Sequence, residues 1–166
     1  QTMARPVKEG WITAKTADIN DLYERSVQCP ESEVSLIYQA WDELRERKPV
    51  VIREDFCGTS AVAREWVKQN DINRVVGVDL DPSVLAWANN KIASELTENQ
   101  ISRVDLIEHD VFTVDLPLVD CTLAMNFSYY GFKKRDQLLR YFESVKRGLK
   151  DDGIFLLDAY GGSDSF

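Results

Sequence analysis

The sequence predicts a single α/β domain in which helices cover a parallel β-sheet. Two patterns support this prediction: short apolar strands alternate with helical segments from residue 50 onward, and the first repeat forms a strand–turn–helix–strand unit. Of the 166 residues, 44% are hydrophobic and 29% are charged, a balance typical of one globular domain with a substantial core.

Residues 1–48 carry helical patterns and no strand pattern. A short helix is expected over 18–27, and Ser32 is a candidate N-cap for a second, amphipathic helix. Pro49 ends this second helix and leads into the first strand. We therefore expect two parts, an N-terminal helical cap or lid over residues 1–48 and a core domain over residues 49–166.

The most informative segment begins with the first strand. It reads as a buried strand at 50–52, a tight turn at 54–60, a helix at 61–69 and a second strand at 75–78. Asp79 follows the second strand directly. Such a unit places a turn and a helix N-terminus beside a strand-end carboxylate, which can accept hydrogen bonds from both hydroxyls of a ribose. The segment therefore predicts a site for a nucleoside-containing cofactor.

The remaining sequence continues the alternation of strands and helices. The expected elements are a helix at 82–96, strands at 103–108 and 119–125, a helix at 135–149, a turn at 151–153 and a last strand at 154–157. Because helices separate successive strands, parallel pairing with right-handed crossovers is expected.

Charge and composition restrict the partners that the protein can have. The 28 acidic residues outnumber the 20 Lys and Arg residues, and the resulting net charge of −8 argues against nucleic-acid binding, which relies on basic patches. Three cysteines and one histidine lack metal-ligand spacing, so no metal is expected, and a reducing, cytoplasmic setting is the default. No apolar run is long enough to cross a membrane.

The turn at 54–60, which reads EDFCGTS, resembles the first motif of the class I S-adenosylmethionine-dependent methyltransferases. In that family an acid and three alternating glycines follow the first strand. Glu54 matches the acid and Gly58 the central glycine, whereas Phe56 and Ser60 occupy the two outer glycine positions. The motif is therefore a variant one, with a single glycine kept.

Three later segments are similar to further motifs of the same family, in the expected order. Asp79 in VGVD matches the acid that holds the ribose, and Asp110 in EHDV matches the acid that receives the adenine amino group. Asn126 lies after the fourth strand, where the family places residues that face the substrate and the cofactor. Glu54 would reach the methionine ammonium, and the residues that follow the two strand-end acids would form apolar walls for adenine. The complete implied cofactor-binding set is Glu54, Phe56, Cys57, Gly58, Thr59, Asp79, Leu80, Asp110, Val111 and Asn126, with no catalytic residue assigned.

The resemblance also implies a Rossmann-like, doubly wound sheet. The family fold has seven strands in the order 3-2-1-4-5-7-6, and the sequence accounts for five of them, in the order 3-2-1-4-5. We therefore expect the core to be truncated at its C-terminal side. The fifth strand would then be an exposed edge through which the chain could associate with itself.

The function implied by the resemblance is transfer of a methyl group from S-adenosylmethionine to an unidentified acceptor, with S-adenosylhomocysteine as the product. The acidic charge favours a small molecule or a protein as acceptor. Two alternatives stay open: a module that binds S-adenosylmethionine without catalysis, and a nicotinamide-dependent dehydrogenase. The dehydrogenase is disfavoured because residues 57–61 do not fit the Gly-x-Gly-x-x-Gly fingerprint of dinucleotide binding.

Overall fold

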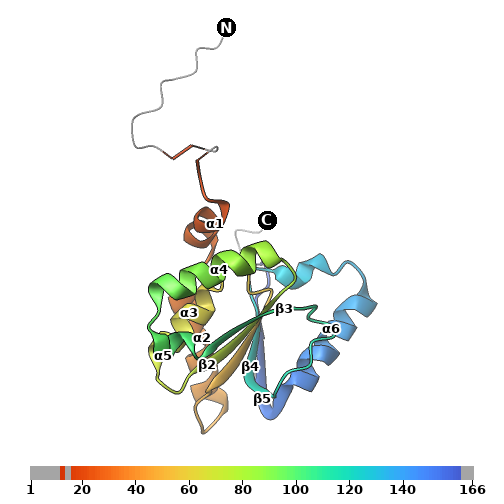
Figure 1. Ribbon diagram of the computed structural model, residues 1–166. Helices are drawn as coiled ribbons and strands as arrows, with labels where there is room; N and C mark the ends of the chain where they lie inside the picture. Colours follow the sequence, from red (N-terminus) through yellow and green to blue (C-terminus); the bar gives the residue numbers. More distant parts are fainter. Residues whose placement is uncertain (1–11, 14–15, 162–166) are drawn as a thin grey trace.

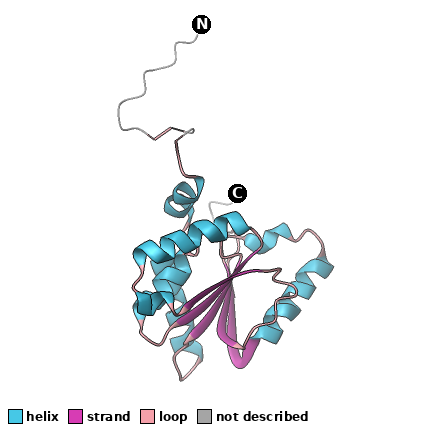
Figure 2. Ribbon diagram, in the orientation of Figure 1, coloured by secondary structure: helices cyan, strands magenta, loops and turns pink. Residues whose placement is uncertain are grey.

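The computed structural model describes residues 12–13 and 16–161, and it has the predicted Rossmann-like architecture of five parallel strands with helices on both faces (Figure 1, Figure 2). The strands are β1 (Val51–Asp55), β2 (Arg74–Asp79), β3 (Val104–Glu108), β4 (Val119–Ala124) and β5 (Leu149–Leu157). They pair in the order β3-β2-β1-β4-β5, so the predicted fold class and strand order are confirmed.

Helices connect most of the strands and precede the first one. They are α1 (Ile19–Val27), α2 (Pro30–Leu44), α3 (Ala61–Gln69), α4 (Pro82–Glu95), α5 (Glu98–Ile101), the 3₁₀-helix η1 (Ser128–Gly131) and α6 (Arg135–Gly148). Helices α2, α3 and α4 cover one face of the sheet and α6 covers the other (Figure 1). The carboxyl ends of all five strands meet at one edge, where ligands bind in folds of this kind.

Three of the predicted elements have a boundary that differs from the structure by two residues or more, among them α2, which ends at Leu44 and not at Pro49. Helix α2 begins at Pro30 with Cys29 as its N-cap, two residues before Ser32, because a proline at the first helical position loses no hydrogen bond there. Strand β1 continues to Asp55, so that Glu54 and Asp55, which the sequence pattern places in the turn, belong to the strand. The predicted turn at 151–153 lies inside β5, where the pairing with β4 shifts in register.

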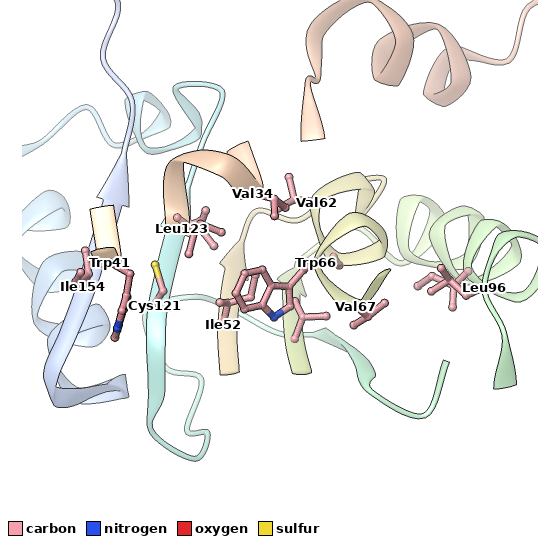
Figure 3. Packing of buried hydrophobic residues seen from close by; sticks show 14 residues of the cluster. Val34, Trp41, Ile52, Val62, Trp66, Val67, Leu96, Cys121, Leu123 and Ile154 are labelled. Atoms are coloured by element: carbon pink, nitrogen blue, oxygen red, sulfur yellow. The ribbon is translucent and has the colours of Figure 1, made fainter. Parts of the chain in front are cut away.

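The larger hydrophobic core lies between the sheet and α2, α3 and α4. Figure 3 shows the side chains that gather there, among them Trp41 of α2, Trp66 of α3 and Ile52 of β1, all of them fully buried. Because α2 contributes to this core, the predicted division after residue 48 does not coincide with a break in packing. Residues 1–11, 14–15 and 162–166 of the two predicted parts lie outside the described residues.

On the other face of the sheet, β1 carries a buried network of charges. Arg53 donates to Oδ1 of Asp55 at 2.6 Å, and the hydroxyl of Tyr141 on α6 donates to Oδ2 of Asp55 at 2.8 Å. All three side chains are about 1% exposed or less. Burial of a charge is costly unless the charge is paired in this way, which explains how a central strand can hold Arg53 and Asp55.

Helix α1 is attached to the domain by polar contacts instead of apolar burial, since none of its residues is buried. Its N-cap Asp18 accepts from the indole of Trp87 on α4, and Glu24 accepts from Arg64 on α3 at 2.6 Å. Figure 1 shows α1 above the edge at which the strands end. The role of a lid for this segment stays a prediction, as do the truncation and the self-association through the free edge of β5.

Candidate functional site

The turn after β1 keeps the backbone of a glycine-rich motif although it has lost two of its glycines. Phe56, Gly58 and Ser60 have φ angles of 58°, 48° and 58°, all in the left-handed region that glycine favours. The amide of Cys57 donates to the carbonyl of Val78 at 3.1 Å and so fixes the turn against β2. The sequence lacks the alternating glycines, but the backbone at these three alternating positions has the conformation that glycines would adopt. The non-glycine residues Phe56 and Ser60 are therefore strained.

Asp79 at the end of β2 faces this turn. Its Oδ2 accepts from the amide of Gly58 at 2.9 Å, and its Oδ1 accepts from the amide of Asp81 at 3.0 Å. Each oxygen of a carboxylate can accept a second hydrogen bond. Asp79 is thus oriented by two backbone donors and keeps acceptor capacity on both oxygens, as the recognition of two adjacent hydroxyls requires.

Glu54 lies at the end of β1 and is 6% exposed. Its Oε2 has no hydrogen-bond partner among the described residues. Burial raises the pKa of Glu54 well above its ordinary value, the nearby carboxyl of Glu33 raises it further, and the amide of Ala63 opposes the rise. An orphaned, buried carboxylate oxygen at this position fits a cationic group of a ligand, because the cation would remove both the electrostatic and the hydrogen-bonding penalty.

Glu33 on α2 is a site residue that sequence reasoning missed. Burial raises its pKa to about 7, the amide of Cys29 opposes the rise, and Asp158 adds to it. Its Oε2 also has no partner among the residues that the structure describes. An acid in the first turn of a helix is an ordinary sequence feature, so no local signal distinguishes Glu33 from a solvated helix residue.

Asn126 is held beside the end of β5 by Asp158, a second residue that the sequence did not single out. The carboxylate of Asp158 accepts from the amides of Asn126 and Phe127, each at 2.9 Å. Both residues have left-handed φ angles, 56° and 57°. The hydroxyl of Tyr129 donates to the Asp158 carbonyl at 2.8 Å. The segment after β4 is thus fixed in an unusual conformation at the carboxyl edge, which is characteristic of functional sites.

Asp110 lies beside Asp79 at the same edge, because the amide of His109 donates to the Asp79 carbonyl at 2.9 Å. Oδ1 of Asp110 accepts from the amide of Phe112, also at 2.9 Å. Leu80 is 66% exposed and is available to an apolar ligand surface. The structure therefore brings Leu80 and the two strand-end acids together, as the motif resemblance implies.

Four other predicted residues have structural contacts of their own. The side chains of Phe56 and Val111 pack in the second core with Tyr141, and the Thr59 hydroxyl donates to Oε1 of Gln28 at 2.6 Å. Burial, followed by the charge of Glu54, raises the pKa of the Cys57 thiol, so this cysteine is a neutral packing group. These residues can contact a ligand through their backbone, whereas their side chains stabilise the turn.

Two further features limit what the site can be. Within residues 12–13 and 16–161 no group of three or more His, Cys, Asp or Glu residues is arranged to hold a metal ion. A surface hollow of about 650 Å³, lined by residues 42–47 and Asp152, lies at the amino-terminal edge of the sheet, away from the strand-end acids. The candidate site is therefore an open carboxyl edge that carries several acids.

The chain folds as a Rossmann-like α/β domain in which the strand-end acids lie at the carboxyl edge of the sheet. The family model described as "Methyltransferase domain" matches residues 55–153, which is more than half of the sequence. The chain belongs to this methyltransferase family, as the motif resemblance predicts. A search of curated proteins found no significant match.

Several solved structures with similar folds are methyltransferases. The glycopeptide N-methyltransferase MtfA has a TM-score of 0.65 at 20% identity, with 80% of this chain and 54% of MtfA covered. A S-adenosylmethionine-dependent methyltransferase from Clostridium acetobutylicum has a TM-score of 0.69 at 20% identity, with coverages of 82% and 54%. For the sugar N-methyltransferase KedS8 from Streptoalloteichus the TM-score is 0.67 at 20% identity, with coverages of 100% and 63%.

This chain thus spans between about half and two thirds of the length of these proteins, and the likeness shows a shared fold. MtfA has also been solved in complex with S-adenosylmethionine and with S-adenosylhomocysteine. In the part of the chain that the structure describes, no helix combines the length and the apolar character needed to span a membrane.

Proposed function

We propose that this chain is the core of a S-adenosylmethionine-dependent methyltransferase that acts on an unidentified acceptor, with a small molecule or a protein favoured by the acidic net charge. The observation that carries the proposal is the left-handed turn whose Gly58 amide is bonded to the Asp79 carboxylate. This contact fixes a glycine, which has no side chain to obstruct a ligand, next to an acid suited to ribose hydroxyls.

The residues at the carboxyl edge fit the three parts of such a donor. Asp79 would accept from the ribose hydroxyls, and Leu80 and Asp110 would contact the adenine. Glu54, with its unpartnered Oε2, would face the ammonium of the amino-acid half. Val111 is buried in the second core, the partly buried Phe56 packs against that core, and both side chains would hold the backbone of the site in place.

S-adenosylmethionine supplies a methyl group that is activated by its attachment to a sulfonium. In the transfer, a lone pair of the acceptor atom forms the new bond to the methyl carbon, and the pair of the broken carbon–sulfur bond stays on sulfur. A proton on the acceptor atom is then lost to solvent. The chain's own residues act by holding both reactants in line, which converts a bimolecular reaction into an intramolecular one.

The proposal is tested by titration calorimetry of the chain with S-adenosylmethionine, S-adenosylhomocysteine and, as a control ligand, NAD. Wild type should bind both adenosyl ligands and not NAD. Asp79→Ala should lose this binding, whereas Asp105→Ala, which removes an exposed acid from the middle of β3, should keep it. Binding of NAD alone, or equal effects of the two substitutions, would contradict the proposal.

Catalysis is separated from mere binding by product formation. MtfA is named a glycopeptide N-methyltransferase and KedS8 a sugar N-methyltransferase, which supports an acceptor screen that begins with glycopeptides and sugars that carry a nitrogen. Formation of S-adenosylhomocysteine that depends on an acceptor would establish the enzyme. Tight binding without turnover, on an acceptor set that a full-length relative methylates, would instead support the non-catalytic binding module. The dehydrogenase alternative is not favoured, since the family match is to methyltransferases.

A further inference from the structure

Two carboxyl groups from distant parts of the sequence lie close enough at the carboxyl edge for the charge of one to act on the other, and neither forms a salt bridge within the described part of the chain. Glu54 comes from β1 and Glu33 from α2, and each has a buried Oε2 with no hydrogen-bond partner among the described residues. The nearest cation on α3, Arg64, directs its donors to the Thr59 carbonyl, Glu24 and Glu95. The pair therefore lacks the compensation that buried carboxylates ordinarily have.

The surroundings of the pair are mostly acidic. The groups that shift the pKa of Glu33 or Glu54 lie on several elements: the Cys29 amide before α2, Arg64 and the Ala63 amide of α3, Asp79 of β2 and Asp158 after β5. Burial, followed by the charges of Glu33, Glu54 and Asp158, raises the pKa of Tyr23 on α1. Two carboxylates that share a poorly solvated space do not both ionise readily, so one of them retains a proton near neutral pH. The raised pKa of each group is consistent with this state.

We infer that Glu33 and Glu54 together bind the primary ammonium group of the donor's amino-acid half, and that the proton which the pair holds without ligand passes to solvent when this group binds. The inference rests on the proposed function and extends it to a residue outside the glycine-rich turn. An ammonium has three donors and a positive charge, so it satisfies both orphaned oxygens and allows both carboxylates to ionise. The number of protons on the protein falls as the ligand binds, and the binding is therefore coupled to pH.

The test compares Glu33→Gln with Glu31→Gln, which removes an exposed charge from the same helix turn. Calorimetry with S-adenosylhomocysteine at about pH 6, in two buffers of different ionisation enthalpy, gives the number of protons released per ligand. We expect Glu33→Gln to release about one proton fewer per ligand than wild type and Glu31→Gln, because the Glu33 carboxyl, with a pKa of about 7, is protonated at pH 6 and the glutamine carries no such proton. At about pH 8, where Glu33 is ionised, Glu33→Gln should weaken the affinity about tenfold.

5′-Methylthioadenosine, which lacks the ammonium together with the rest of the amino-acid half, identifies the half of the ligand that Glu33 recognises. Its affinity should change by less than about twofold in Glu33→Gln. Equal weakening of both ligands, no weakening of either, or unchanged proton release in Glu33→Gln would overturn the inference. If wild type bound neither S-adenosylhomocysteine nor 5′-methylthioadenosine, the proposed function itself would fail, so the two failures are distinguishable. Thermal unfolding of each variant verifies that it is folded.

Discussion

Gly77 in the middle of β2 lies directly against the side chain of Cys57 in the neighbouring turn. A Cβ placed on Gly77 would be 2.9 Å from the Cys57 Sγ and 2.7 Å from Cδ2 of Leu106 on β3. Real Cβ atoms do not approach other atoms so closely. The turn at residues 54–60 can therefore pack against β2 only because residue 77 has no side chain. This contact determines how near the turn can come to Asp79.

We expect Gly77→Ala to destabilise the protein by about 1–3 kcal/mol, because overpacking forces the turn or Leu106 to move. Chemical unfolding measures the effect, and Gly131→Ala is the matched control, since a Cβ there meets nothing within 4 Å. In the double variant Cys57→Ala/Gly77→Ala part of the loss should be recovered, because the thiol is one of the atoms in conflict. Strict additivity of the two single effects would refute this explanation.

Ser60 occupies a glycine position of the turn, yet the conformation is already the left-handed one. Ser60→Gly should therefore change the affinity for S-adenosylhomocysteine by less than about twofold and the stability by less than about 1 kcal/mol, since relief of strain and the flexibility of glycine oppose each other. Ser60→Val should cost about 2 kcal/mol or more, because a β-branched residue is poorly accommodated at positive φ. A large gain in affinity for Ser60→Gly would mean that the serine side chain obstructs the ligand.

The pKa of Glu33, raised from 4.5 to about 7 by burial, predicts a dependence of stability on pH. The folded state binds this proton more tightly than the unfolded state does. The stabilisation is thus fully present below pH 4.5 and is lost as the pH rises through about 7. Urea midpoints should fall between about pH 5 and pH 8 in wild type and Glu31→Gln, and less steeply in Glu33→Gln. Equal slopes in the three proteins would exclude Glu33 as the origin.

The three cysteines should differ in reactivity. Cys29 is exposed, whereas Cys57 and Cys121 are buried, and burial raises the pKa of the Cys121 thiol to about 12 and also raises that of Cys57. A thiol reagent should thus modify only Cys29 in the folded protein and all three residues after unfolding. Removing Cys29 by substitution to Ser should abolish the native-state reaction. Rapid modification of Cys57 in the folded chain would show that the turn opens.

Sequence patterns predicted the sheet and its acids well, because the relevant signals are local. Val75 to Val78 form a short apolar run, typical of a strand buried on both faces, and the acid that follows it stays at the strand end whatever conformation the loop takes. The predicted strand ends at residue 52 and the predicted turn begins at Glu54, whereas β1 continues to Asp55, since Arg53 and Asp55 are unusual residues for a central strand. Their partner Tyr141 is 86 residues from Asp55 in sequence, and only the folded structure brings them together.

The residues of the candidate site likewise fall into two groups, those that local sequence predicts and those that only tertiary packing brings to the site. The turn residues and Asp79 follow from spacing along one short segment. The positions of Glu33 and Asp158 depend instead on how α2 and the end of β5 pack at the carboxyl edge, which is a tertiary property. The left-handed geometry of Phe56 and Ser60 was also hidden, because neither residue type favours it and the hydrogen bonds of the turn impose it.

The buried network of Arg53, Asp55 and Tyr141 has a consequence for how this sequence can diverge. Loss of one charged member leaves its partner stranded in the interior, which in general costs about 3–5 kcal/mol, whereas replacing a whole buried set by apolar residues is often neutral. Homologues that lack this network should therefore have replaced all three residues together, because an intermediate with only one of them replaced would be barely stable. Among homologues, the three residues should be inherited as a unit.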